Sequence, residues 1–300
     1  MPAYQMSLLG GFELRRKGKV VRLPTRKGEA LLAYLALAPQ RGHARDTLTA
    51  LLWGDASDQS ARASLRQTLF LIGKAFDRSA IETDGRTVVL ARGTLDIDVL
   101  EFERSSANGA AEGLERAAEL YRGELLAGIV VNEPSFEEWL VAERERLRER
   151  IIEVLARLVT VYRARGNADR AIQAALRLTA LDPLEEDAHR VLMSLYADTG
   201  RRAAALRQYQ SCVEVLQREL GAEPASETRV LYRDILQHEP AATKVHPTER
   251  GMERFVSTVP AEAERPIDTP SPIGRSAELS RLNEVLDRTQ RGHGSVAIIV

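Results

Sequence analysis

The feature that most constrains the fold is an internal repeat in the second half of the chain. Four positions recur after 34 residues, namely Leu158 as Leu192, Tyr162 as Tyr196, Gly166 as Gly200 and Ala171 as Ala205. This spacing is typical of tetratricopeptide (TPR) repeats, in which paired helices stack and small residues let them approach closely. Two units are too few for a free-standing solenoid, so flanking helices must complete the core. The repeat therefore predicts an all-α TPR-like helical domain over residues 97–238.

The first hundred residues carry strand patterns around three helical patterns. Alternating runs flank Gly10-Gly11, which suits a two-residue hairpin turn, and a third short run follows at residues 20–23. A second hairpin is expected over residues 80–90, with Asp84-Gly85 as a type I′ turn. Together with the three helices between them, these strands predict an α+β winged helix-turn-helix domain over residues 1–96.

The three helices of this domain follow from the spacing of apolar residues. Thr25 is a suitable N-cap for the first helix, which should end before Pro39. The second helix is expected over residues 45–52 and the third over residues 58–76. Trp53 lies at the end of the second helix among leucines, so we expect it in the core rather than stacked on a nucleobase.

The third helix is the candidate DNA reader. Its apolar stripe, formed by Leu65, Leu69, Ile72 and Phe76, should face the core and leave the opposite side exposed. A helix fits the major groove of DNA, where Gln can pair with adenine and Arg or Lys with guanine. The candidate DNA-binding residues on this helix are Arg62, Ser64, Arg66, Gln67 and Lys74.

Three further basic residues are candidates for phosphate contacts. Arg26 and Lys27 lie at the start of the first helix, and Arg86 lies at the tip of the second hairpin. Phosphate contacts set affinity and salt dependence rather than sequence preference. Residues 1–96 hold 15 Lys and Arg against 9 Asp and Glu, whereas the remainder holds 27 against 34. The basic first domain favours a polyanionic partner there, and a merely solvated basic surface is the alternative.

Other chemistry has little support in the sequence. The one cysteine, Cys212, excludes an intramolecular disulfide and is expected to be buried. The five histidines lack metal-ligand spacing, and the alternating Glu and Arg residues of 143–153 are expected to form a solvated helix laced with ion pairs. No catalytic residue, cofactor or metal is predicted. The chain lacks a signal peptide and a run of about eighteen apolar residues, so we expect a cytoplasmic protein without a membrane partner.

Several sequence strings resemble a known family. Residues 31–37, 51–53 and 64–69 resemble the OmpR-like winged helix of SARP-type antibiotic-pathway activators. The strings that resemble the bacterial transcriptional activator domain are residues 121–126, Trp139 with 143–147, 181–183, 188–193, 208–209 and 219–224. The resemblance implies that the protein binds double-stranded promoter DNA and recruits or positions RNA polymerase.

One departure from the family leaves three alternatives open. Relatives place basic residues near the end of the recognition helix, where this chain has Leu71 and Gly73. DNA binding could be weak, could need a homo-oligomer, or could have been lost. In the last case the chain would be a protein-interaction scaffold with a vestigial winged helix, and Phe70 and Leu71 would contact a protein partner.

The end of the chain carries a second resemblance. Six prolines over residues 239–272 predict a linker. Residues 273–300 are similar to the entrance of a STAND or AAA-like signal-transduction ATPase, in which a phosphate-binding loop would follow the last strand. That loop is not in these 300 residues, so we expect a truncated module. The N-terminal part of such an ATPase is therefore a further alternative for the chain.

Overall fold

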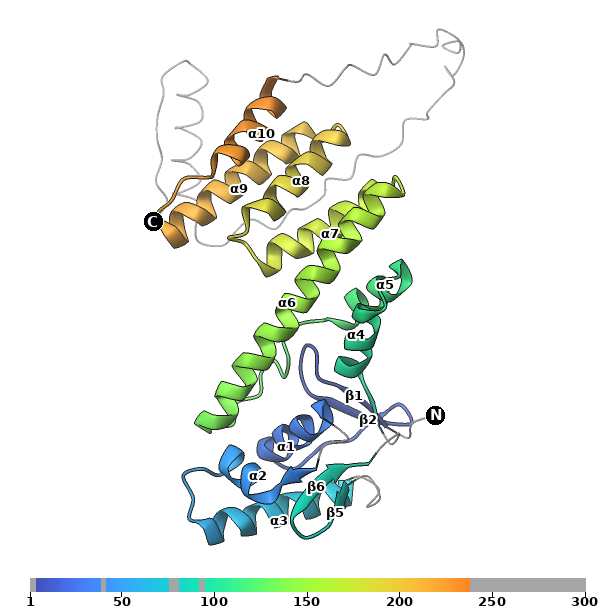
Figure 1. Ribbon diagram of the computed structural model, residues 1–300, viewed down its shortest axis with the longest axis vertical. Coiled ribbons are helices and arrows are strands. Elements are labelled where there is room, and N and C mark those ends of the chain that lie inside the picture. The colour runs from blue at the N-terminus through green and yellow to red at the C-terminus, as the bar shows by residue number, and fades with distance from the viewer. Residues whose placement is uncertain (1–3, 39–41, 76–80, 92–94, 238–300) are drawn as a thin grey trace, which may run out of the picture. The chain divides into compact units, whose positions relative to one another are not determined.

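The computed structural model describes residues 4–38, 42–75, 81–91 and 95–237. These residues belong to one compact unit, Met1–Thr243. The predicted linker (239–272) and the start of the ATPase-like module (273–300) lie outside the described residues. The unit has an N-terminal mixed α/β region followed by an all-helical region (Figure 1), which confirms the predicted fold class.

A four-stranded sheet opens the chain. It contains β1 (Tyr4–Ser7), β2 (Glu13–Arg16), β3 (Lys19–Val20) and β7 (Leu95–Ile97), in the order β3-β2-β1-β7. The first three strands are antiparallel, whereas β7 pairs with β1 in parallel. β7 is not among the predicted strands, because three residues are too few for an alternating pattern and its partner is about ninety residues away.

The first predicted hairpin is confirmed, but the prediction that two residues form its turn is wrong. Ser7 pairs with Glu13, so five residues connect β1 to β2. The loop is longer because its backbone binds the helical region: Leu126 N donates to Leu8 O at 2.8 Å, and Gly10 N donates to Glu124 O at 3.0 Å. Gly10 has a φ of 93°, a conformation that favours glycine.

Three helices follow the first hairpin: α1 (Arg26–Leu37), α2 (Arg45–Leu52) and α3 (Asp58–Ala75). Thr25 caps α1, because its hydroxyl accepts a hydrogen bond from Gly28 N at 3.1 Å. α2 and α3 pack against each other, and both contact α1. Trp53 is buried at the end of α2, which confirms its predicted place in the core.

A three-stranded sheet forms the wing. Its order is β4 (His43–Ala44), β6 (Thr87–Leu90), β5 (Ile81–Thr83). The two-residue β4 is too short to be predicted from an alternating pattern. The predicted type I′ turn is wrong: Thr83 pairs with Val88, which leaves four residues in the turn. The reason is the Asp84 carboxylate, which accepts hydrogen bonds from Arg86 N and Thr87 N and holds a wider loop.

Seven helices make up the described part of the helical region. They are α4 (Asp98–Ala107), α5 (Ala111–Leu120), α6 (Pro134–Ala164), α7 (Ala168–Leu181), α8 (Glu186–Asp198), α9 (Arg202–Leu220) and α10 (Ser226–Gln237). The two repeat units are the pairs α6–α7 and α8–α9. Gly166 and Gly200 both have a positive φ near 70° in the turns between paired helices, which explains why glycine recurs there.

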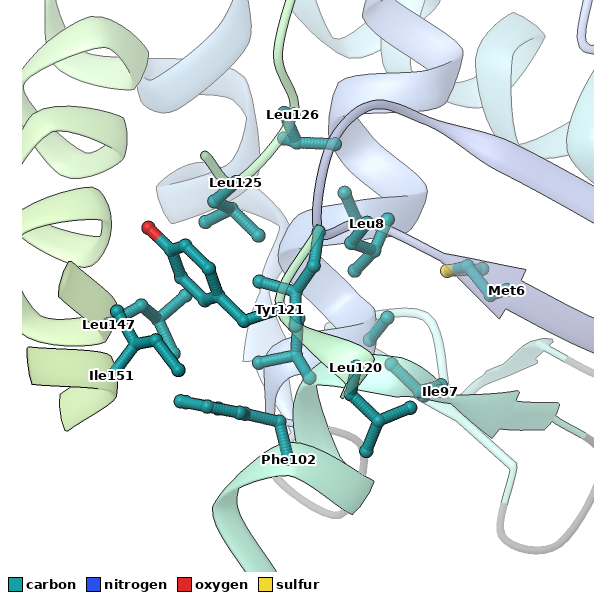
Figure 2. Close-up of a cluster of buried hydrophobic side chains, with 14 of the residues drawn as sticks. Met6, Leu8, Ile97, Phe102, Leu120, Tyr121, Leu125, Leu126, Leu147 and Ile151 are labelled. Carbon is teal, nitrogen blue, oxygen red and sulfur yellow. The ribbon is translucent and has the colours of Figure 1, made fainter. Parts of the chain in front are cut away.

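The two regions share one hydrophobic core. Figure 2 draws Met6 and Leu8 of the N-terminal region in one cluster with Tyr121, Leu147 and other side chains of the helical region. Leu8 and Leu147 are fully buried. Trp139 of α6 adds to this contact by packing edge-on against Tyr34 of α1, with ring centroids 5.0 Å apart.

The predicted solvated, ion-paired helix is confirmed only in part, because two arginines of α6 bind backbone carbonyls of other segments. Ion pairs between residues three apart do line it, as between Arg146 and Glu143. Arg144, however, donates to the carbonyl oxygens of Leu125 and Leu126 at 2.8 and 3.2 Å, and Arg148 donates to Leu181 O. Arg144 thus holds a loop onto α6, and Arg148 holds the end of α7 onto it.

Candidate nucleic-acid interface

The outward face of α3 is set by what the helix buries. Ala61, Leu65, Thr68 and Ile72 are buried against the core and form one stripe, with Leu69 partly buried beside it. Of the predicted stripe, Phe76 lies outside the described residues. The opposite face is therefore free of the core, as the period of 3.6 residues per turn requires.

The five predicted residues of α3 differ in exposure and in pairing. Arg66, Gln67 and Lys74 are exposed, and among the described residues none of the three has a hydrogen-bond or ion-pair partner. Arg62 is exposed but pairs with Asp46 at 3.3 Å, and Ser64 is half-buried. Two cations and one amide on this helix are thus available to a ligand.

The two predicted residues at the start of α1 are already paired. Arg26 Nη1 lies 3.1 Å from Glu29 Oε2, one helical turn away. Lys27 donates to Glu133, a buried carboxylate from the helical region, and its ammonium lies 5.6 Å from the centre of the Trp53 ring. Lys27 is therefore engaged in holding the two regions together.

A groove of about 720 Å³ runs beside α3. Its lining includes Arg26 and Lys27 from α1, Ser64, Gln67 and Leu71 from α3, and Val130 and Val131 from the loop before α6. Four of the predicted residues therefore meet in one place. Arg62, Arg66, Lys74 and Arg86 are not part of this lining.

Arg86 lies in the wing, within the turn between β5 and β6. It is exposed, and its backbone N donates to the Asp84 carboxylate at 2.9 Å. The amides of Thr87 and Arg86 lower the pKa of Asp84, so the turn keeps a charged carboxylate as its acceptor. The wing thus presents an arginine side chain on a defined loop, apart from the groove.

Known proteins resemble this chain in sequence, and its helical region matches a known domain family. Residues 99–236 match the model of the bacterial transcriptional activator domain. The regulatory protein AfsR of Streptomyces coelicolor is 28% identical over 300 residues, which cover 95% of this chain and 29% of AfsR. The transcriptional regulatory protein MoaR1 of Mycobacterium tuberculosis is 26% identical over 267 residues, which cover 83% of this chain and 84% of MoaR1. The chain is a SARP/AfsR-like transcriptional regulator.

A solved structure has the same fold as this regulator. EmbR of Mycobacterium tuberculosis, in complex with a low-affinity phosphopeptide, superposes with a TM-score of 0.60 and 23% identity, over 80% of this chain and 66% of EmbR. The regulator spans only 29% of the length of AfsR. Among the described residues, none of its helices has the length and apolar character to cross a bilayer.

The activator domain contributes to this candidate interface in a way that no sequence pattern predicts. Glu133 binds both Lys27 and Gly54 N, the latter at 3.1 Å, and Val130 forms a wall of the groove with 65% of its surface exposed. Glu133 is 106 residues from Lys27, and no local pattern marks such a pair. The regulator's Glu133 precedes Pro134 at the start of α6, which signals a helix start but not a partner.

The family's basic positions near the end of the predicted recognition helix correspond to Leu71 and Gly73 of α3. Leu71 is partly buried and lines the groove, and Gly73 is partly buried within α3. Among the described residues, an added Cβ at Gly73 would meet no atom within 4 Å. The regulator therefore has room for a larger side chain at this position, and the glycine is not required by packing.

Proposed function

We propose that this regulator binds double-stranded promoter DNA by placing α3 in the major groove. The supporting observation is the outward face of α3, where Arg66, Gln67 and Lys74 are exposed and without partners among the described residues. A helix of this length offers such a face to base edges, while the wing contacts the backbone beside it.

Each predicted residue takes a distinct role in this proposal. Gln67 pairs with adenine, and Arg66 and Lys74 contact guanine or phosphate. Arg62, Arg26, Ser64 and Arg86 add contacts to the sugar-phosphate backbone. Lys27 joins them only if Glu133 releases it, because one ammonium held by a buried carboxylate is a poor counterion for a phosphate.

The partners beyond DNA belong to the same proposal. RNA polymerase is the expected target of the activator domain, by analogy with the transcriptional regulators that the chain matches. A homo-oligomer would offset the loss of basic residues at positions 71 and 73, since each added phosphate contact steepens the salt dependence of binding. Duplex promoter DNA as the partner implies a cytoplasmic location.

Fluorescence anisotropy with genomic DNA fragments, titrated at several salt concentrations, tests the proposal. Arg66→Ala and Lys74→Ala should each weaken binding and reduce the slope of log K against log[salt] by about 0.9. Gln67→Ala should change sequence preference more than affinity. Arg163→Ala, an exposed arginine on α6 paired with Asp198, is the control and should leave both unchanged. Unaltered binding in all three α3 variants would contradict the assignment of the reading helix.

A protein-interaction scaffold is the second candidate. The groove beside α3 favours it, because Leu71 and the exposed Val130 give this groove an apolar character that DNA would not require. Absence of DNA retention at low salt, with a folded protein, would support the scaffold over the DNA-binding regulator.

A further inference from the structure

Phe70 is a large apolar side chain on the outward face of α3. It is 56% exposed, although it belongs to a helix whose other side is fully buried. It is two positions from Thr68 on one side and from Ile72 on the other, which puts it roughly 200° around the helix from each. Phe70 thus lies at the centre of the face turned away from the core.

Two cationic side chains flank Phe70 on this face. Arg66 precedes it and Lys74 follows it by four residues, so both flank it on the helix surface. Both are exposed, and among the described residues neither has an anionic partner. Phe70 does not belong to the lining of the groove that contains Leu71 and Val130. The apolar ring therefore lies between two cations that have no anionic partner in the described part of the chain.

This combination favours one kind of partner. An apolar protein surface laid on Phe70 would strip water from Arg66 and Lys74 without supplying anions, which is costly. The major groove of DNA supplies anions for the two cations and an apolar group for the ring. Phosphates line its edges, and thymine alone presents a methyl group to it. The charges beside Phe70 thus select DNA over an apolar protein patch.

We propose that Phe70 is a specificity-determining residue that packs against the 5-methyl group of thymine in the bound site. The inference rests on the proposed function and adds a base preference to it. Gln67 lies one helical turn before Phe70, a rise of about 5 Å that corresponds to one or two base pairs. The preferred site therefore contains a thymine within about two base pairs of the adenine that Gln67 contacts.

The experiment uses the full 300-residue chain and a duplex selected by it from a random library. Each thymine of the selected site is replaced in turn by deoxyuridine, which removes only the methyl group and keeps every hydrogen-bonding edge. Loss of one buried methyl should weaken binding about three- to fivefold at one or two positions. In Phe70→Ala, binding should fall by a similar factor, and replacement at the same positions should have no further effect.

Two controls keep the test specific. Val141→Ala removes another exposed apolar side chain, on α6, and should leave the deoxyuridine sensitivity intact. Thermal unfolding checks that Phe70→Ala is folded, and Phe70→Leu, which keeps an apolar contact, should retain part of the sensitivity.

The outcomes separate this inference from the proposed function. Salt-dependent DNA binding with no response to any deoxyuridine, or with the same response in Phe70→Ala, would overturn the thymine contact and leave DNA binding standing. Failure of the folded chain to bind any duplex at low salt would remove both. Loss of self-association in Phe70→Ala, with unchanged DNA binding, would instead assign Phe70 to a protein interface.

Discussion

The carboxylate of Glu133, at the start of α6, accepts a hydrogen bond from the ammonium of Lys27, at the start of α1. The same carboxylate accepts a hydrogen bond from Gly54 N, just after α2. One buried acid therefore fixes the long helix of the activator domain to two elements of the winged helix, next to the base of α3.

Glu133→Ala should destabilise the protein. It leaves the ammonium of Lys27 and the amide of Gly54 without their acceptor, and we expect the free energy of unfolding in urea to fall by about 1–3 kcal/mol. This range is below that of a fully buried pair because the Lys27 side chain is 32% exposed. Arg163→Ala, which breaks an exposed pair, should cost less than about 1 kcal/mol. Equal losses in the two variants would contradict the role of Glu133.

Asp98 should give the stability a specific pH dependence. Burial raises its pKa above the ordinary value of 3.8, although hydrogen bonds from the amides of Leu8 and Leu9 act in the opposite direction. The folded protein therefore keeps this proton to higher pH than the unfolded chain. The resulting stability is fully present below pH 3.8 and is lost as the pH rises through the folded-state pKa.

Asp98→Asn isolates this contribution because asparagine can still accept from an amide but does not titrate. Measured by urea unfolding from about pH 7 to about pH 4, the wild type should gain stability relative to the variant as the pH falls. A difference that is constant, or that runs the other way, would show that the amides of Leu8 and Leu9 outweigh burial.

Cys212 should be inert in the folded protein. Burial raises its pKa to about 11, with the charge of Glu186 adding to the effect, so its thiolate fraction near neutral pH falls roughly a hundredfold below that of a free thiol. Reaction with a disulfide reagent at about pH 8 should be slow and should accelerate on unfolding in urea. Ala63→Cys in a Cys212→Ala background, an exposed thiol on α3, should react quickly without denaturant.

Gly73→Lys should strengthen both the helix and the DNA interaction. The position is inside α3 and leaves space for a Cβ, so replacing glycine should raise the free energy of unfolding by about 0.5–1 kcal/mol. The added cation should steepen the salt slope of DNA binding by about 0.9. Gly73→Ala is the matched control and should show the stability gain alone. A slope unchanged by lysine would mean that this side of α3 does not face phosphates.

Local signals predicted much of the fold. The helix over residues 45–52 has the predicted bounds, and Thr25 caps α1 as expected, because spacing and capping act within a few residues. Gly166 and Gly200, one of the four recurring pairs, both have a left-handed backbone at the end of a helix, which gives that pair a structural reason. Cys212 is buried as predicted. His189 is buried with both ring nitrogens bonded, to Pro183 O and to Gln208.

Contacts between residues far apart in the chain could not be predicted from local sequence patterns. β4 and β7 are two and three residues long and depend on distant partners for their hydrogen bonds. The first turn was misjudged because Leu8 and Gly10 bind the activator domain, which no local pattern shows. In the candidate interface, the exposed face of α3 followed from its period, whereas the engagement of Lys27 by Glu133 required the folded structure.

The parallel pairing of β7 with β1 affects how the molecule can be divided. β7 is the edge strand that covers β1, and Asp98 directly after it binds the amides of Leu8 and Leu9. A fragment ending at residue 94 would bare the backbone of β1, and an uncovered strand is a template for pairing with another molecule. The strand that directly precedes the activator domain thus covers an edge of the N-terminal sheet that would otherwise be open to pairing with another molecule.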